Sequence, residues 1–349
     1  MPRELPFLPT TVVGSHALPS WLCLVRQHLE AFGPTDREEA YDDAVRLAIR
    51  DQIEAGIDVI SDGEMRRTMF IRSFYDRLTG LVPVAVPRRF GPPNYDSHCP
   101  FDVVDRVQAP TGLGIVDEFR FARVHADRPL RVAVPGPITL LMPLRRGGPY
   151  ATEDSLLADL VAIVHREVRG LADAGCDFIQ IDEPNYVMTA GKHRVVREGV
   201  EPLFEALRAV VHGVRAKTAL HVCFGNAHGN SFATPRRYRA LYPALLDSPV
   251  DQFLFEYANR EMAEIELWSD FPTTKEVAVG VIDVKAYRVE SAEEVAARVR
   301  RALAHLPAER VWLAPDCGLW ETPRWVAVSK LRSLVEAARL LRRELSGKP

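Results

Sequence analysis

Residues 178–184 read FIQIDEP, a short apolar run that ends in Asp182, Glu183 and a proline. Similar runs recur along the chain, and continuous apolar runs are typical of strands buried on both faces of a parallel sheet. The other seven runs cover residues 10–15, 58–64, 131–137, 218–225, 252–258, 276–283 and 310–318. The sequence therefore predicts eight buried strands.

Helical patterns separate most of these runs. Thr35 with Glu38, and Ser291 with Glu294, have the spacing of capping boxes at helix N-termini. One amphipathic helix follows Ser155, and its apolar face consists of Leu156, Leu160, Ile163, Val164, Val168 and Leu171. Strands and helices thus alternate along most of the chain.

Eight strand–helix repeats predict an α/β fold, a single (β/α)8 TIM barrel that spans residues 1–349. A doubly wound open sheet is the alternative, but no glycine-rich GxGxxG turn follows an early strand. Residues 82–114 interrupt the alternation, are rich in Pro and Gly, and contain two short β-like stretches. We expect an inserted hairpin or lid over the barrel mouth.

Composition limits the classes of partner. The 349 residues carry a formal net charge of −3, which gives no reason to expect nucleic acid or a membrane surface as a partner. The N-terminus lacks a signal-type apolar segment, and no apolar run approaches the roughly 18 residues that span a bilayer. Five scattered cysteines argue against a disulfide framework. These features predict a cytoplasmic protein.

Polar side chains gather at the ends of the predicted strands. Active sites of such barrels lie at the C-terminal ends of the strands, and carboxylates that end apolar strands are costly to bury unless they bind something. The strand-end residues are Ser15, Asp62, Glu64, Asp182, Glu183, His221, Cys223, Glu256, Asp283, Asp316 and Cys317. Their clustering predicts a catalytic site at this end of the barrel.

Four of these residues have the chemistry of a zinc site. His221 and Cys223 are two residues apart, so their side chains share one face of a strand, and Glu256 and Cys317 end later strands. A buried cysteine alone is usually a small apolar filler. An imidazole, two thiolates and a carboxylate together suit Zn²⁺. Zinc lowers the pKa of a bound thiol, so we expect a thiol substrate that attacks a carbon electrophile.

In the same segments the chain resembles the cobalamin-independent methionine synthase family, over its whole length and in the short form that has only the catalytic barrel. The motifs that carry the resemblance are LPTTVVGS (8–15), SDGE (61–64), QIDEP (180–184), LHVCFG (220–225), FEYANREM (255–262), GVIDVKAYRVESAEEV (280–295) and APDCGL (314–319). They stand in the family's order.

The resemblance implies zinc-dependent methyl transfer to the thiol of homocysteine, giving methionine. It implies zinc ligands at His221, Cys223, Glu256 and Cys317. It implies contacts to the amino acid from Val13, Gly14, Ser15, Glu64, Asp182 and Glu183. The residues agree, because a carboxylate pair suits an α-ammonium and backbone N–H groups suit a carboxylate. The alternative is that Glu64 and Asp182 brace the barrel mouth through Arg66 or Arg67.

One position departs from the family. The family's catalytic His, which protonates the leaving group, falls at Lys285. With Lys285 at this position, the resemblance makes Lys285 and Asp182 the predicted catalytic residues. The expected methyl donor is a methylcorrinoid, free or protein-bound, or methyltetrahydrofolate. Alternatives that stay open are alkyl transfer to another thiol such as coenzyme M, a metal-free barrel like uroporphyrinogen decarboxylase, and a non-catalytic module with structural zinc.

Overall fold

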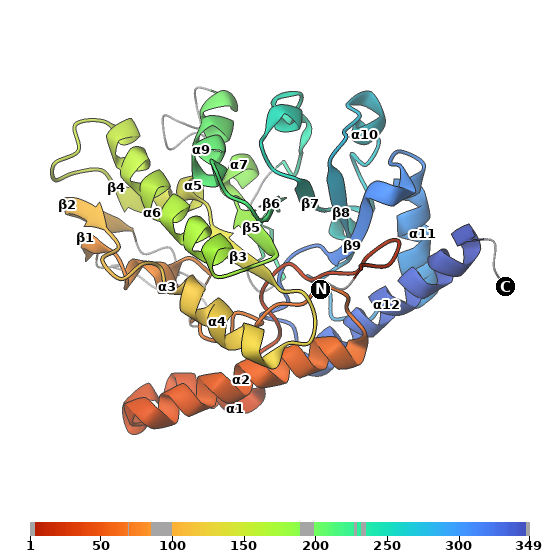
Figure 1. Cartoon of the computed structure of the whole chain (residues 1–349), viewed down its shortest axis with the longest axis horizontal. Coiled ribbons are helices and arrows are strands. Elements are labelled where there is room, and N and C mark those ends of the chain that lie inside the picture. Colours follow the sequence, from red (N-terminus) through yellow and green to blue (C-terminus); the bar gives the residue numbers. More distant parts are fainter. Residues whose placement is uncertain are drawn as a thin grey trace.

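The computed structural model describes residues 4–68, 70–84, 100–188, 199–226, 229–231 and 235–346. Its centre is a parallel sheet whose strand order is β3-β5-β6-β7-β8-β9 (Figure 1). The strands are β3 (Arg131–Pro135), β5 (Phe178–Asp182), β6 (Lys217–Val222), β7 (Gln252–Glu256), β8 (Glu276–Ile282) and β9 (Val311–Pro315). Nearly all of their residues are buried, as continuous apolar runs predict.

Two further segments close this sheet into a barrel. Segment 10–15 bridges in parallel to β9 on one side and to segment 58–64 on the other. Segment 58–64 in turn bridges to Leu130, the residue before β3. All eight predicted strand positions therefore surround one barrel, which confirms the predicted fold class.

Side chains explain why these two segments form bridges rather than regular strands. The Ser61 N–H donates to Oε1 of Gln52 (2.9 Å), and the Ser61 hydroxyl donates to the carbonyl oxygen of Gly14. The Thr10 N–H donates to the Asp58 carboxylate (2.9 Å). Backbone groups that a regular ladder would pair are thus used by side chains.

Helices surround the barrel, and α2 and α12 pack together on its outside (Figure 1). The helices are α1 (Ser20–Gln27), α2 (Pro34–Ala55), α3 (Arg72–Tyr75), α4 (Ile115–His125), α5 (Pro137–Leu141), α6 (Glu153–Asp173), α7 (Asn185–Met188), α9 (Glu201–Val211), α10 (Leu267–Asp270), α11 (Ala292–Leu303) and α12 (Arg324–Ser346). The predicted apolar face of α6 is buried.

The helix starts agree with the sequence in one case and differ in another. Ser291 and Glu294 form the predicted capping box of α11. The predicted box of Thr35 and Glu38 is wrong, because the N-cap of α2 is Gly33, whose N–H donates to Asp36 (3.1 Å). Proline at the first position of α2 shifts the start by two residues.

The predicted insertion contains an antiparallel strand pair. β1 (Thr79–Pro83) pairs with β2 (Phe101–Gln108), and the short β4 (Leu144–Arg145) joins β2 in parallel. The pair begins slightly before residue 82 and ends well before residue 114. Residues 85–99 lie outside the described part of the chain, so a lid over the barrel mouth stays a prediction.

The N-terminal end of the barrel is filled by packed side chains. The Arg131 guanidinium lies 5.9 Å from the ring centre of Phe178 and 6.0 Å from that of Trp312. Its N–H groups donate to Gln180 (3.1 Å) and Gln252. Burial lowers the pKa of Arg131 to about 10, so it remains charged at neutral pH. Solvent and substrate therefore have to approach from the opposite, C-terminal end.

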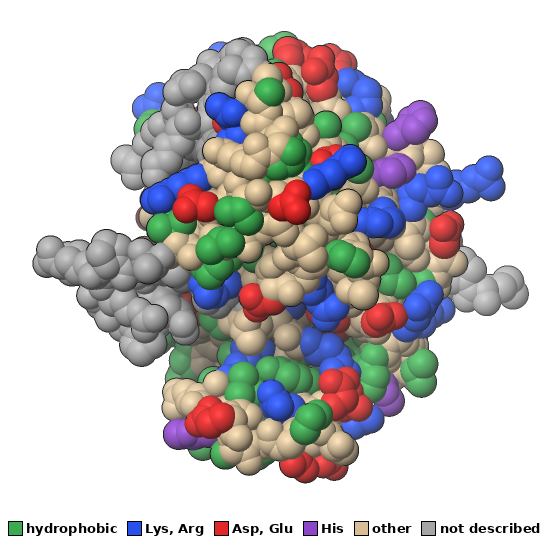
Figure 2. Space-filling model, turned by 90° about the vertical axis from the view of Figure 1, so that its left-hand side faces the viewer, with side chains coloured by type: hydrophobic (Ala, Val, Ile, Leu, Met, Phe, Trp, Pro, Cys, Tyr) green, Lys and Arg blue, Asp and Glu red, His purple; other side chains and the backbone are tan. Residues whose placement is uncertain are grey.

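The surface agrees with the charge balance of the sequence. On the face drawn in Figure 2, acidic and basic side chains of the described residues are interspersed. Within the described ranges, no helix has the length and apolar character needed to cross a membrane. Cysteines 23, 176, 223 and 317 are free thiols, and Cys99 lies outside the described residues.

Candidate active site

Three side chains meet at the C-terminal end of the barrel. His221 lies near the end of β6, Cys223 follows that strand, and Cys317 lies two residues after β9. One ligand atom from each residue lies within 4.8 Å of the other two, and the two sulfurs are 3.7 Å apart. β6 and β9 are not neighbours in the sheet, so these residues meet across the barrel interior. This is the predicted His–Cys–Cys arrangement.

The orientation of His221 suits a metal ligand. Its Nδ1 lies 3.0 Å from the carbonyl oxygen of Leu254, which can only accept, so Nδ1 carries the proton. Nε2 then presents a lone pair toward the sulfurs. It is buried and makes no hydrogen bond of normal geometry to any described residue. A metal ion would satisfy this nitrogen, whose tautomer the backbone fixes.

The two thiols differ in acidity. The hydrogen bond between the two sulfurs holds the pKa of Cys317 well below its ordinary value, against the effect of burial, and His221 lowers it further. The same contact with Cys317, together with burial, raises the pKa of Cys223. Cys317 therefore ionises readily, and its negative charge opposes the ionisation of Cys223. A bound cation allows both to ionise, so these three residues fit zinc.

Glu256, the fourth predicted ligand, ends β7 beside this cluster but has a different partner. Its Oε1 lies 2.8 Å from Nζ of Lys285, and the exposed fractions of the two side chains are 0% and 3%. Its Oε2 accepts the N–H of Phe224 (3.2 Å). Burial raises the pKa of Glu256, and the Lys285 ammonium opposes that rise. The carboxylate thus faces a cation of the chain itself.

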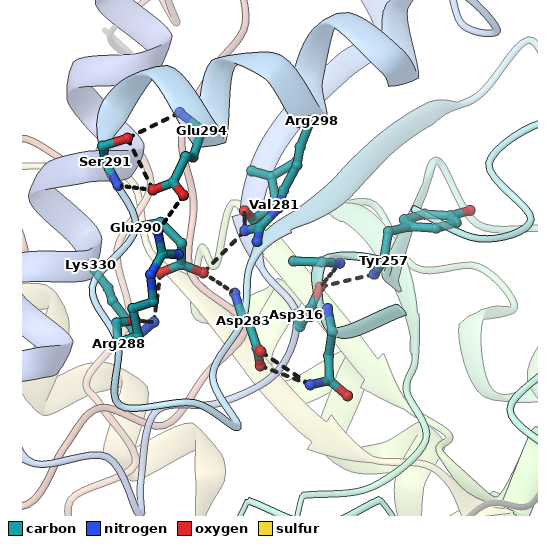
Figure 3. A network of polar contacts seen from close by, with 12 residues as sticks. Tyr257, Val281, Asp283, Arg288, Glu290, Ser291, Glu294, Arg298, Asp316 and Lys330 are labelled. Carbon is teal, nitrogen blue, oxygen red and sulfur yellow. Dashed lines mark hydrogen bonds and ion pairs between the residues drawn. The ribbon is translucent and has the colours of Figure 1, made fainter. Parts of the chain in front are cut away.

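A polar network, whose Asp283, Glu290 and Lys330 are labelled in Figure 3, fixes the backbone next to Lys285. The Lys285 N–H donates to Oδ1 of Asp283 (2.8 Å), whose two oxygens also accept from the Asn259 amide (3.1 Å each). The Asp283 N–H donates to Glu290 (2.8 Å), which pairs with the buried Lys330 (2.6 Å). The position of Lys285 is therefore set by several hydrogen bonds behind it.

Asp316 fixes the turn that follows Glu256. Its carboxylate accepts the N–H groups of Tyr257 (2.9 Å), Ala258 (2.8 Å) and Asn259 (2.6 Å), and the first of these contacts is drawn in Figure 3. Because Asp316 directly precedes Cys317, this residue joins the ends of β7 and β9. The strand-end Asp316 and Asp283 are thus structural supports of the site.

A second group of buried acids lies next to the cluster. Asp182 ends β5 and accepts from Gln180 (2.7 Å), and Oε1 of Glu64 lies 3.0 Å from the Arg67 guanidinium. Burial raises the pKa of Glu64 to about 8, against the charge of Arg67, and the nearby Asp182 adds to the rise. Burial raises the pKa of Asp182 to about 6, partly offset by His221. These carboxyl groups and the cluster therefore share one region.

The first segment of the chain passes through this region. A Cβ on Gly14 would lie 2.4 Å from Oε1 of Glu64, and a Cβ on Gly318 would lie 2.0 Å from the Ser15 hydroxyl oxygen. The backbone at these glycines is thus in close contact with the predicted site. Val13 is buried in the barrel interior, and its carbonyl oxygen accepts from Gln180 (2.7 Å).

Glu183 points to a different place from Asp182. Its oxygens accept the N–H groups of Ile138 and Thr139 (2.9 Å each) and the Thr139 hydroxyl (2.7 Å) at the start of α5. Burial raises its pKa to about 8, against these hydrogen bonds. Since all three contacts hold α5 against β5, the predicted substrate contact of Glu183 finds no support in this geometry.

The alternative of a structural brace holds in part. Arg67 pairs with both Glu64 and Glu118 (3.0 Å each), whereas Arg66 pairs with Glu38 and not with the strand-end acids. The Glu64 carboxyl therefore has one cation beside it. A role in bracing does not exclude a role in binding, because a carboxylate can accept several donors.

Sequence reasoning gave no chemistry to Asn226 and overlooked Trp320. The Asn226 amide donates to the carbonyl oxygen of Gly318 (3.3 Å), and its Oδ1 is buried without a hydrogen bond to any described residue. Nε1 of Trp320 is also buried without a hydrogen bond to any described residue. Each residue follows one of the clustered cysteines by three positions, and this spacing is the signal that the sequence offered.

Comparison with known proteins gives a consistent result. Residues 8–340 match the family model described as the catalytic domain of cobalamin-independent synthase. The methionine synthase of Saccharolobus solfataricus is 34% identical over 348 residues, which are 99% of this chain and 98% of that protein. The methionine synthase of Sulfolobus acidocaldarius is 34% identical over 351 residues, or 100% and 96%.

Solved structures agree. The B12-independent methionine synthase from Shewanella sp. W3-18-1, in complex with selenomethionine, superposes with a TM-score of 0.83 and 28% identity, over 98% of this chain and 100% of that one. A putative vitamin-B12 independent methionine synthase from Listeria monocytogenes gives a TM-score of 0.71 at 18% identity, over 97% and 99%, which supports the fold.

Proposed function

The chain belongs to the cobalamin-independent methionine synthase family of methyltransferases, and from this premise we propose that it transfers a methyl group to the thiol of homocysteine, forming methionine, with zinc as cofactor. The observation that carries the proposal is the meeting of His221, Cys223 and Cys317 beside a group of buried acids. Metal ligands and amino-acid contacts then occupy one region of the barrel mouth.

The thiol is held by the cluster. His221, Cys223 and Cys317, with Glu256 as the fourth ligand, would hold zinc, which would keep a substrate thiol ionised at neutral pH. The His221 tautomer is fixed by Leu254, so this ligand needs no rearrangement. The sulfur of the substrate attacks the methyl carbon as the bond from that carbon to the donor breaks.

The amino acid is held by the first segment and the acids. Glu64 and Asp182 accept from the α-ammonium, and backbone N–H groups near Gly14 and Ser15 face the carboxylate. The selenomethionine in the Shewanella relative supports an amino-acid site, because it is the selenium analogue of methionine. Glu183 contributes indirectly by holding α5 in place.

The methyl donor is a methylcorrinoid or methyltetrahydrofolate. A corrinoid leaves as a stable anion and needs no proton, whereas a folate nitrogen needs one from a nearby acid. Lys285 is buried against Glu256, so it can serve as that acid only if the pair separates. This contact favours the corrinoid over the folate.

A donor screen tests the proposal. Zinc-loaded protein is mixed with L-homocysteine and methylcobalamin, methyltetrahydrofolate or its polyglutamate, and methionine is measured by mass spectrometry. Methionine formation with one donor is the expected result. Coenzyme M serves as the competing acceptor, and we expect no product with it because its sulfonate would face Glu64 and Asp182. Product with coenzyme M alone, or with neither thiol, would reject the proposal.

A further inference from the structure

We propose that Lys285 is the partner that receives the Glu256 carboxylate when the substrate thiolate takes its place at the metal. The inference rests on the proposed function and deepens it. Lys285 is then a positioning residue that acts through Glu256, rather than a group that touches the methyl donor. It stands where the family has a proton-donating His, and its neighbours indicate a different use.

The first support is the ion pair itself. Oε1 of Glu256 lies 2.8 Å from Nζ of Lys285, and both side chains are buried. Neither atom makes another hydrogen bond to a described residue. A buried carboxylate without a counter-charge is strongly unfavourable. Glu256 can therefore leave a metal only if a cation is within reach, and Lys285 is such a cation.

The second support is that only the end of Glu256 has to move. Its backbone N–H donates to the Tyr238 hydroxyl (2.9 Å), which in turn donates to the carbonyl oxygen of Val222 (2.8 Å). Its Oε2 is held by the Phe224 N–H (3.2 Å), one residue after Cys223. The backbone is thus fixed, and Oε1 is the atom that can exchange one partner for another.

The third support is that Lys285 is held in place from two sides. Its N–H donates to Asp283, which belongs to the network of Figure 3. Gly229 packs against its carbonyl group so closely that a Cβ there would lie 2.8 Å from the oxygen. The ammonium group is therefore presented toward Glu256 by a fixed backbone, as a receiving partner requires.

The charge balance of the site also favours a move of the Glu256 carboxylate to Lys285. A substrate thiolate adds a negative charge to a site that already has two cysteine thiolates and a carboxylate. If Glu256 moves to Lys285, the two form a neutral pair, and the metal keeps one histidine and three sulfur ligands. Without Lys285 the displaced carboxylate would add its repulsion to that of the sulfurs.

Zinc X-ray absorption and calorimetric titration with homocysteine test the inference on the full chain. Lys285→Met is compared with Lys217→Met, which breaks another Lys–Glu pair, with Glu276 (2.7 Å), at the N-terminal ends of β6 and β8. In the wild type we expect an oxygen neighbour of zinc to be replaced by sulfur. In Lys285→Met we expect unchanged zinc content, a retained oxygen neighbour and a homocysteine Kd raised about tenfold or more. Lys217→Met should bind homocysteine like the wild type.

A double variant makes the assignment specific. Glu256→Gln removes the charge that Lys285 balances, so adding Lys285→Met to it should change the homocysteine Kd less than about twofold. A Kd within about twofold of wild type in Lys285→Met alone would overturn the inference and leave the proposed function standing. If the zinc of the wild-type protein gains no sulfur neighbour when homocysteine is added, the inference and the proposed function are both rejected.

Discussion

Glu64 and Asp182 are buried carboxyl groups in one region with different acidities. Burial raises the pKa of Glu64 to about 8 and that of Asp182 to about 6. At pH 7 Asp182 is therefore mostly ionised, whereas Glu64 is mostly protonated. An α-ammonium group that binds between them favours the ionised form of both acids. Binding of an amino acid should then release a proton, chiefly from Glu64.

This leads to a pH prediction for methionine, which has the ammonium group but no thiol. Its affinity should rise between pH 6 and pH 8, because Glu64 loses its proton over that range. Calorimetry at pH 7 in two buffers of different ionisation enthalpy should detect proton release by the wild type and little by Glu64→Gln. Equal release by both proteins would assign the proton to another group.

Cys317 gives the second prediction at this scale. Cys317→Ser replaces the thiolate that forms most readily by a hydroxyl that binds zinc poorly. We expect loss of bound zinc and of methyl transfer, with an unchanged far-UV circular dichroism spectrum. Zinc per chain is measured after dialysis by plasma mass spectrometry.

Cys176→Ser is the matched control, because Cys176 is buried away from the cluster and donates to the carbonyl oxygen of Phe178 (3.4 Å). It should retain zinc. Full zinc content in Cys317→Ser would remove this residue from the ligand set.

The sequence was sufficient for those residues whose chemistry is local. His221 and Cys223 share a strand face because they are two residues apart, and Cys317 ends a strand of the same barrel. The pairing of Glu256 with Lys285 was not predictable, because it joins the ends of two strands whose side-chain directions no pattern specifies. The role of Glu183 was not predictable either, because its hydrogen bonds to the start of α5 depend on how that helix packs against the sheet.

At the scale of elements, Glu167 of α6 holds the start of α4. Its carboxylate accepts the N–H groups of Leu113 (2.8 Å), Ile115 (2.7 Å) and Val116 (3.2 Å). These are N–H groups at a helix start, which have no partner within the helix. One side chain thus joins the insertion, α4 and α6.

Glu167→Ala should therefore destabilise the protein by about 2–4 kcal/mol, because it leaves buried donors without an acceptor. Urea unfolding followed by circular dichroism measures the change. The control is Glu205→Ala at an exposed position of α9, which should change stability by less than about 0.5 kcal/mol. A loss as small as the control's would mean that solvent replaces the missing acceptor.

Element positions were more predictable than element form. Apolar runs located all eight barrel segments, since burial on both faces is a property of composition. The same runs could not indicate that the side chains of Gln52 and Ser61 would form hydrogen bonds with backbone groups of segments 58–64 and 10–15 in place of a strand partner. Likewise, the capping box predicted at Thr35 failed because Gly33 and Asp36 form an equivalent cap that begins two residues earlier.

At the scale of the whole molecule, the barrel and the metal site are held by different contacts. Parallel pairing runs round the full barrel, and Arg131 with its partners fills the N-terminal end. The cluster lies at the other end, on residues that follow the strands. A chain of this size buries enough core to fold without a metal, unlike small zinc domains that unfold when the ion is removed.

Chelation should therefore separate function from fold. After treatment with a strong chelator and removal of the complex, we expect loss of methyl transfer and an unchanged far-UV spectrum at 25 °C. Zinc binds the folded state preferentially, so free zinc at a hundred times its Kd should add about 2.7 kcal/mol of stability, visible as a higher Tm. Returning zinc should restore both activity and Tm. If chelation instead abolishes the far-UV spectrum of the folded protein, the ion is needed to hold β6 and β9 together. Strand pairing in the barrel would then be insufficient for folding.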